Sequence, residues 1–269
     1  MKAIVFNLSG QKAREIELPS VFNTPIDTGL IKRAVLAIQS SRLQPKGIFP
    51  GAGRQNTGVM VGVRWLPTSE RSINVGHARL PRMKNRRNLL AGRVVKIPRA
   101  VGGPKAHPPK VQKNIVENIN KKEKQKALMC AIAATASQKM VNQRSDSTGQ
   151  MVVPLIVENA FEGLAKTSEV IKVLEAIKVF SEIENAKKKK KIRAGKGKRR
   201  GRKYKRKKSI LIVTAKSAKV YKGARNLEGV DIVEARNLNA ELLAPGTKAG
   251  RLTVWTEGAV AEVQKLWGK

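Results

Sequence analysis

One stretch of the chain, residues 45–110, constrains the fold more than any other. Its 66 residues include 14 Lys or Arg and one acid, Glu70, and it holds 8 of the 12 prolines and 9 of the 22 glycines. No apolar period in it is long enough to predict a core-facing helix or a paired strand. Structureless segments of this length are usually functional or disordered. We therefore predict that this segment, which we call the arm, becomes ordered only against a polyanion.

The excess positive charge is confined to the arm and one further segment. Residues 187–208, which we call the basic cassette, contain 16 basic residues and no acid, so they contribute +16, and the arm contributes +13. The other 181 residues carry about +7 of the net +36, which is ordinary for a globular domain. A solvated face is the alternative explanation for a single charge run. Two runs of this density favour nucleic-acid binding.

Outside these segments, short apolar runs predict strands. Residues 2–8 and 14–18 predict a hairpin around a turn at residues 9–12. Four later runs predict further strands, at residues 151–157, 210–213, 230–234 and 252–256. Pro154 removes an amide donor, so it indicates an edge or a bulge in the first of these four.

Amphipathic segments between the strands predict helices. Asp27 is a suitable N-cap for a helix over residues 28–42, and Thr167 or Ser168 for a later helix that carries Val170, Val173, Leu174 and Ile177. Further helical segments are expected at residues 121–137, 218–226, 239–243 and 257–267. Strands that alternate with helices predict an α/β fold with a mostly parallel sheet.

The residue inventory offers little for catalysis. Cys130 is the only cysteine, so it excludes an intrachain disulfide and fits a reducing, cytoplasmic compartment; we predict a small buried hydrophobe there. With His77 and His107 as the only histidines, the usual four-ligand zinc site cannot form. Residues 51–53 and 195–198 lack the spacing and the preceding strand of nucleotide-binding loops. We expect no catalytic residue, metal, cofactor or membrane span.

Arginine in the arm gives the clearest functional signal. Its nine arginines outnumber its five lysines, and guanidinium groups bind phosphate oxygens in pairs and stack on bases. Only ten residues of the chain are aromatic, which favours phosphate contact over base stacking. We predict insertion of the arm into folded RNA. The candidate RNA-binding residues are Arg54, Arg64, Arg71, Arg79, Arg82, Arg86, Arg87, Arg93, Arg99, Lys105, His107 and Lys110 in the arm, and Arg193, Lys196, Lys198, Arg199, Arg200, Arg202, Lys203 and Tyr204 in the cassette.

Three stretches resemble a known family. Residues 191–204 (KIRAGKGKRRGRKY) resemble the basic signature of the large-subunit ribosomal protein L-four family in its archaeal and eukaryotic branch. Residues 243–246 (LAPG) and 250–257 (GRLTVWTE) resemble the same branch. Residues 97–103 (IPRAVGG) and 106–110 (AHPPK) are similar to the return limb of the arm in archaeal members. The chain ends at Lys269 without the eukaryotic extension, so we expect the archaeal type.

The resemblance implies a structural constituent of the large ribosomal subunit that binds large-subunit rRNA and helps assembly. It implies a three-layer α/β/α domain, formed here by residues 1–44 and 111–269, with the arm as an extended rRNA-binding loop at 45–110. Residues 187–208 would be a second rRNA-binding segment. The loop would line the polypeptide exit tunnel near the nascent peptide, with its apex within residues 64–87. Neighbouring ribosomal proteins are further expected partners. An RNA-modifying enzyme and a DNA-packaging protein remain as alternatives.

Overall fold

The protein consists of two units. The computed structural model describes residues 1–60, 76–84, 89–145, 151–216 and 219–268. One unit, which we call the globular unit, comprises Met1–Arg42 and Val116–Lys269. The other, which we call the arm unit, comprises Leu43–Ile115 and contains the whole arm. Each unit has its own internal contacts and is described by itself.

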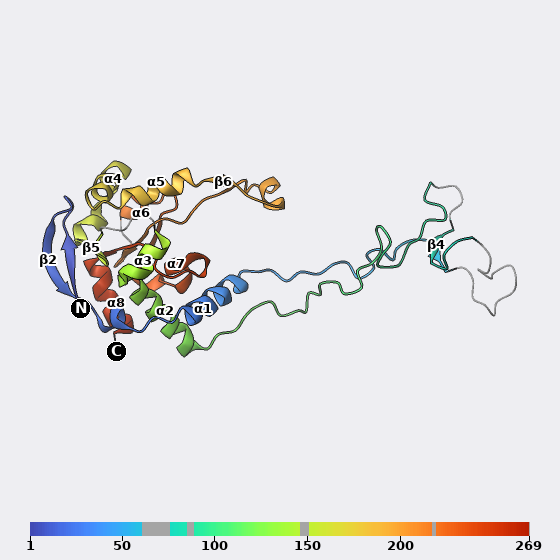
Figure 1. Ribbon diagram of the computed structural model, residues 1–269, viewed down its shortest axis with the longest axis horizontal. Helices are drawn as coiled ribbons and strands as arrows, with labels where there is room; N and C mark the ends of the chain where they lie inside the picture. Colours follow the sequence, from blue (N-terminus) through green and yellow to red (C-terminus); the bar gives the residue numbers. More distant parts are fainter. Residues whose placement is uncertain (61–75, 85–88, 146–150, 217–218, 269) are drawn as a thin grey trace. The chain divides into compact units, whose positions relative to one another are not determined.

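The globular unit is built on a six-stranded sheet (Figure 1). The strand order is β2-β1-β5-β10-β8-β9. Their bounds are Lys12–Glu17 for β2, Lys2–Phe6 for β1, Leu155–Val157 for β5, Thr253–Thr256 for β10, Leu211–Thr214 for β8 and Asp231–Glu234 for β9. Only the β1–β2 pair is antiparallel, and every other neighbouring pair is parallel. The predicted α/β fold with a mostly parallel sheet is therefore confirmed.

The central strands are buried along their whole length because both faces of the sheet are covered. Every residue of β5, β8 and β10 is buried. Successive residues of a strand point to opposite faces, and the packing follows that rule. Trp255 belongs to one hydrophobic cluster and Val254 to the other. Leu211 and Val213 likewise face the first cluster, whereas Ile212 faces the second.

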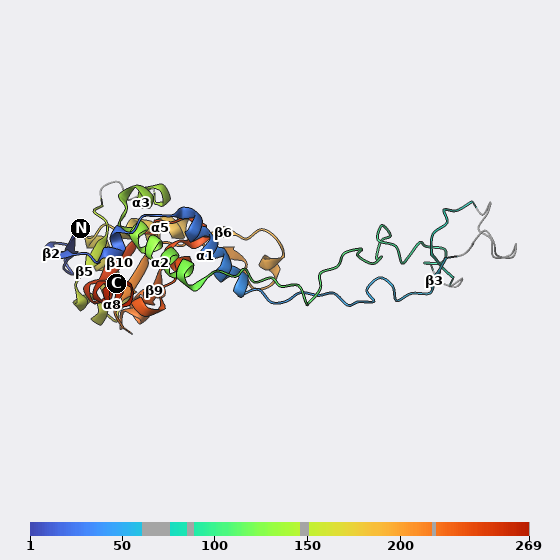
Figure 2. The ribbon, with the colours of Figure 1, turned by 90° about the horizontal axis from the view of Figure 1, so that it is seen from below.

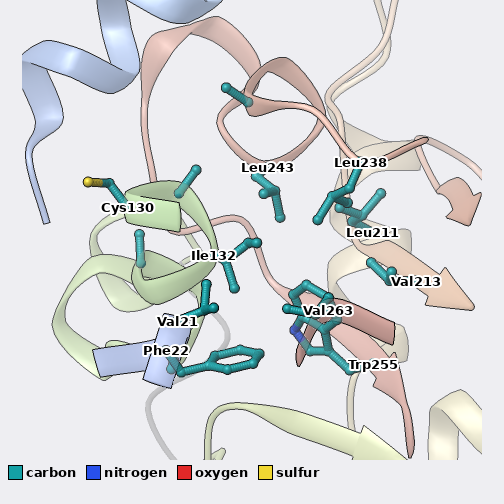
Figure 3. Close-up of a cluster of buried hydrophobic side chains, with 14 of the residues drawn as sticks. Val21, Phe22, Cys130, Ile132, Leu211, Val213, Leu238, Leu243, Trp255 and Val263 are labelled. Atoms are coloured by element: carbon teal, nitrogen blue, oxygen red, sulfur yellow. The ribbon is translucent and has the colours of Figure 1, made fainter. Parts of the chain in front are cut away.

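Helices on one face of the sheet cover the first cluster. They are η1 (Ser20–Asn23), α1 (Thr28–Ser41), α2 (Lys121–Ala136), α7 (Ala240–Leu243) and α8 (Glu257–Trp267). Figure 3 shows side chains of this cluster from η1, α2, α7 and α8. The ring of Trp255 meets that of Phe22 edge to face, with the ring centroids 5.5 Å apart. Aromatic pairs prefer this geometry because a positive ring edge meets a negative ring face.

Helices on the opposite face cover the second cluster and complete a three-layer domain. They are α3 (Gln138–Arg144), η3 (Asn159–Gly163), α4 (Thr167–Ala176), α5 (Phe180–Lys188) and α6 (Val220–Ala224). In Figure 1, α4 and α5 lie on one side of the strands, and α8 and α2 on the other. Val170, Val173, Leu174 and Ile177 are buried as predicted. The helical period in the sequence thus predicted the buried face of α4 correctly.

Local signals were right at some helix ends and wrong at others. Asp27 caps α1 as predicted, since its carboxylate accepts a hydrogen bond from the backbone N–H of Leu30 at 3.0 Å. The predicted cap at Thr167 or Ser168 is wrong, because both residues lie inside the first turn of α4 and the N-cap is Lys166.

Three further sequence predictions about regular structure need correction. The strand expected at residues 151–157 begins only at Leu155, directly after the proline that lacks an amide donor. The helices α3 and α5 were not expected. The first has 7 residues, and the second ends in a lysine run and buries an acid, Glu182, on its inner face. Neither therefore shows the regular apolar stripe by which helices are recognised.

A buried arginine ties the parallel strands to their connections. Arg251 lies two residues before β10, and its side chain is fully buried. Its guanidinium donates hydrogen bonds of 2.7–3.2 Å to four backbone carbonyl oxygens, those of Ser209, Ile210, Gly229 and Leu242. Its Nη2 also pairs with Oδ2 of Asp231 at 2.8 Å. Burial lowers the pKa of Arg251, and the charge of Asp231 opposes this shift.

Arg144 makes a similar connection at the end of α3. Its Nη1 donates to the carbonyl oxygens of Pro245 and Lys248 at 3.0 and 2.6 Å. Burial, followed by the positive charge of Arg251, lowers the pKa of Arg144 to about 10. Arg144 therefore keeps its charge at neutral pH.

We predict that Arg251→Met destabilises the globular unit by about 3–5 kcal/mol, because it leaves four backbone carbonyls without the donor that binds them and removes one of the two cations paired with Asp231. The free energy of unfolding is measured by urea titration of the whole protein. Arg236→Met is the matched control, since Arg236 is 66% exposed and pairs only at 3.7 Å with Glu262. A change of about 1 kcal/mol or less is expected there. Equal losses in both variants would contradict this role of Arg251.

We also predict that deleting residues 50–105 leaves the globular unit folded. The chain ends that flank the arm unit already meet, because the backbone N–H of Glu117 donates to Oγ of Ser40 at 2.9 Å. The entropy of loop closure changes only slightly with the length of the loop, so shortening the arm has little effect on it. Urea titration followed by tryptophan fluorescence should keep a cooperative transition, reported by the buried Trp255. Loss of that transition would contradict the prediction.

Candidate nucleic-acid interface

The arm unit is held together by its own backbone. Its two limbs run side by side (Figures 1 and 2). Gly53 has a φ of +78°, and a Cβ there would collide with the backbone of Gly103 and Pro104. Only glycine permits both this conformation and so close an approach.

Short strands pair farther along the arm, so the expectation that no strand pairs in it was wrong. β3 (Gly58–Val59) and β4 (Arg82–Met83) are antiparallel. Met83 also exchanges backbone hydrogen bonds with Arg93 and Gly92, at 3.1 and 3.0 Å. Each strand has only two residues, which is too short for an alternating pattern to appear in the sequence.

Two cations of the arm hold this backbone. Arg82 donates from Nη1 to the carbonyl oxygen of Gly92 at 2.9 Å and from Nη2 to that of Ala78 at 3.1 Å. Lys96 donates from Nζ to the carbonyl oxygen of Gly58 at 2.7 Å. Arg82, a candidate RNA-binding residue, therefore also has a local structural role.

The other candidate residues of the arm fall into two groups. Those that the structure describes are exposed and spread over both limbs: Arg54, Arg79, Arg93, Arg99, Lys105, His107 and Lys110. Arg64, Arg71, Arg86 and Arg87 lie outside the described residues, as does most of the expected apex at 64–87. The described cations are distributed along the arm and do not form one compact site.

The basic cassette has a shape of its own. β6 (Lys191–Ile192) and β7 (Tyr204–Lys205) pair antiparallel, and the 3-10 helix η4 (Lys196–Arg199) lies between them. We call residues 191–205 the hairpin. Charge dominates the sequence of this segment, so no alternating pattern there indicated that its two ends pair. Gly195 and Gly201 have φ values of +79° and +77°, so the chain can turn on either side of η4.

Arg193 holds the hairpin closed. Its backbone N–H donates to the carbonyl oxygen of Lys203 at 2.8 Å, and its Nε donates to that of Arg202 at 3.1 Å. It is half-buried, unlike the other candidate residues of the cassette, Lys196, Lys198, Arg199, Arg200, Arg202, Lys203 and Tyr204, which are exposed. Arg193 thus stabilises the scaffold on which the others are presented.

Cations flank the one aromatic ring of the cassette. The Nζ atoms of Lys190 and Lys203 lie 4.6 and 5.6 Å from the ring centroid of Tyr204. Cations at this distance are attracted by the negative ring face. The Tyr204 ring therefore helps to hold two lysine side chains close together. The residue itself is 47% exposed.

A cavity of about 460 Å³ lies at the base of the hairpin and is lined entirely by basic side chains. Lys188, Lys190, Lys191 and Lys205 contribute to it, and none of them was among the candidate residues. The lysine run was visible in the sequence, but the pairing that brings Lys191 opposite Lys205 was not. The geometry suits an anion that carries several negative charges.

The described residues hold no comparable site for a metal. They contain no group of three or more His, Cys, Asp or Glu side chains able to bind an ion. Cys130 is buried as predicted, with Sγ 3.2 Å from the carbonyl oxygen of Pro25. No helix in the described part of the chain is long and apolar enough to cross a membrane.

We predict that Arg193→Gln opens the hairpin, whereas Arg199→Gln does not. Both substitutions remove one positive charge, but only Arg193 donates from its side chain to the backbone of the opposite strand. Hydrogen–deuterium exchange should become faster at the backbone amides of residues 191–205 in the first variant. Equal exchange in both variants would contradict this role.

Comparison with known proteins gives a consistent result. Residues 16–266 match the model of the ribosomal protein L4/L1 family. The chain is 46% identical over 266 residues to the large ribosomal subunit protein uL4 of Methanoculleus marisnigri, covering 99% of this chain and 100% of that protein. It is 48% identical over 260 residues to the protein of the same name from Archaeoglobus fulgidus, covering 97% of each.

The relationship extends to other archaea. The uL4 protein of Methanocaldococcus jannaschii is 45% identical over 267 residues, which cover 98% of this chain and 99% of that protein. The resemblance seen in residues 97–110, 191–204 and 243–257 is thereby confirmed over nearly the full length. The chain belongs to the ribosomal protein L4/L1 family, whose members are structural components and not enzymes.

Proposed function

We propose that this protein is a structural constituent of the large ribosomal subunit, in the cytoplasm, and that it binds large-subunit rRNA through the arm and the basic cassette. The observation that carries the proposal is the separation of charge. Nearly all acids of the chain belong to the globular unit, whereas the arm has one acid and the cassette none. The relatives' name, large ribosomal subunit protein uL4, states the same assembly for them.

The exposed cations are arranged for phosphates that lie close together. Arg54, Arg99 and Lys105 are exposed and lie on the two adjacent limbs of the arm. Packed RNA brings phosphate groups from different strands into proximity, and cations between them offset their repulsion. A two-limbed arm with charge on each limb fits between RNA segments in this way.

The globular unit would act as the anchor. Several of its basic residues are paired with acids, among them Arg14 with Glu257 at 2.7 Å and Arg42 with Glu241 at 2.7 Å. These pairs reduce the charge that is available for nucleic acid outside the two basic segments. Binding would therefore be concentrated in the arm and the cassette.

The proposal also includes specific partners within the ribosome. The arm would reach the wall of the polypeptide exit tunnel and lie near the nascent peptide, while the globular unit would contact neighbouring ribosomal proteins. Both rest on family membership together with the length of the arm. Ordering of the arm by rRNA would make the protein useful early in assembly.

The proposed function is tested by co-sedimentation with large subunits and by salt titration. In cell extract at high magnesium, the protein should sediment with the large subunit. With deproteinised large-subunit rRNA, the logarithm of the binding constant should fall steeply and linearly with the logarithm of salt concentration, because neutralised phosphates release counterions. Sedimentation with chromatin, or binding that does not depend on salt, would contradict the proposal.

A further inference from the structure

Three consecutive cations at the end of the cassette are bound to three acids of the globular unit. Nη1 of Arg206 lies 3.0 Å from Oε2 of Glu228. Nζ of Lys207 lies 3.1 Å from Oε2 of Glu182, and Nζ of Lys208 lies 2.7 Å from Oδ1 of Asp231. The three acids come from three places in the chain: α5, the segment after α6, and β9. The chain leaving β7 is thus fastened at three successive residues.

The middle pair is the most protected from solvent. The side chain of Glu182 is 3% exposed and that of Lys207 is 24% exposed. The hydroxyl of Ser145, which follows α3, donates to the other oxygen of the same carboxylate. A buried carboxylate is costly unless it is paired and hydrogen-bonded. The position of Lys207 is therefore determined much more strictly than that of a surface lysine.

The chain beyond the three cations is also fixed. The backbone N–H of Ser209 donates to the carbonyl oxygen of Gly229 at 2.9 Å, and its Oγ donates to that of Glu228 at 2.9 Å. Arg251 binds the Ser209 carbonyl from the other side at 2.7 Å. Residues 206–209 consequently form a rigid base from which the hairpin leaves the globular unit.

Lysines beside this base remain available for a ligand. Lys188, Lys190, Lys191 and Lys205 line the basic cavity together with the paired Arg206 and Lys207, and among the described residues no ion pair joins these four lysines to an acid. Lys205 directly precedes the three fastened residues, and Lys188 ends α5, the helix that carries Glu182. The same helix therefore positions the acid of the anchor and part of the cavity wall.

We propose that Glu182, Glu228 and Asp231 are positioning residues that hold Arg206, Lys207 and Lys208 in place and thereby aim the hairpin. In this arrangement Lys188, Lys190, Lys191 and Lys205 form a cleft for the phosphodiester backbone of RNA. The inference rests on the proposed RNA-binding function and assigns separate roles to neighbouring cations within one basic run. Free polyphosphate has the same chemistry and serves as a second probe.

Whether an acid-to-amide substitution strengthens or weakens RNA binding distinguishes this proposal from simple charge attraction. Glu182→Gln and Glu228→Gln each raise the net positive charge by one. If RNA binding depended only on the net positive charge of the protein, both variants would bind RNA more tightly. If the acids position the hairpin, binding weakens although the protein has become more positive.

The experiment measures binding of the full-length protein to deproteinised large-subunit rRNA, by filter binding over a range of KCl concentrations. We expect Glu182→Gln and Glu228→Gln to weaken binding by about threefold or more, as for residues coupled by direct contact. Glu169→Gln is the matched control, because it removes the 43% exposed acid of the 3.9 Å Lys166–Glu169 pair in α4. Its affinity should be unchanged or slightly higher. Thermal unfolding verifies that each variant is folded. Substitution of Glu228, which is 25% exposed, is expected to disturb folding less than substitution of Glu182, which is 3% exposed.

A double-mutant cycle tests whether Glu182 acts through Lys207. Lys207→Gln alone and Lys207→Gln combined with Glu182→Gln should bind equally, because the acid has no partner left to position. Lys191→Gln should instead reduce the salt slope by about one unit if its ammonium neutralises a phosphate. Inorganic polyphosphate, added as competitor, should displace rRNA from the wild type more readily than from Lys191→Gln.

These experiments distinguish failure of the proposed RNA-binding function from failure of the positioning role. Failure of the wild type to bind rRNA contradicts the proposed function itself. Binding by the wild type, with equal or tighter binding by folded Glu182→Gln and Glu228→Gln, overturns the positioning role. An unchanged salt slope in Lys191→Gln overturns the cleft.

Discussion

The structure depends on the fact that positive side chains cannot be packed together without something negative between them. The chain has 55 Lys and Arg and only 19 Asp and Glu, so most cations lack a possible acidic partner within the protein. Burial of an unpaired charge is too costly for a core to tolerate. The surplus is therefore placed in two segments that contribute little to either hydrophobic cluster, and the three-layer domain folds around an ordinary apolar interior.

The few cations that do enter the interior have full sets of partners. Arg251 is satisfied by carbonyl oxygens from several connections and by Asp231, which in turn also pairs with Lys208. The guanidinium is suited to this position, because its planar fork reaches several acceptors at once. One buried arginine thus joins the sheet to the base of the cassette, and the stability of the domain and the direction of the hairpin share a common element.

Neighbouring cations in one basic run have different structural roles. Arg193 and Arg82 donate to backbone carbonyls and give shape to segments in which none of the described large apolar side chains is buried. Lys207 is bound to a buried acid, whereas Lys196 and Arg200 are exposed. The arm and the hairpin are therefore partly organised by the same kind of residue that we propose for RNA contact. Positive charge alone is a poor guide to which residue makes which contact.

The sequence by itself determined the α/β class, the family resemblance, the separation of charge, the Asp27 cap and helix α8, whose bounds at Glu257 and Trp267 were predicted correctly. These features depend on local composition and on short periods, which a single chain displays directly. Tertiary structure alone decided the strand order, the helices α3 and α5, the two-residue strands of the arm and the partners of Lys207 and Arg251. Those features join residues that are distant in the chain, so their physical cause, the desolvation of a charge or the pairing of a backbone group, exists only once the fold has brought the partners together.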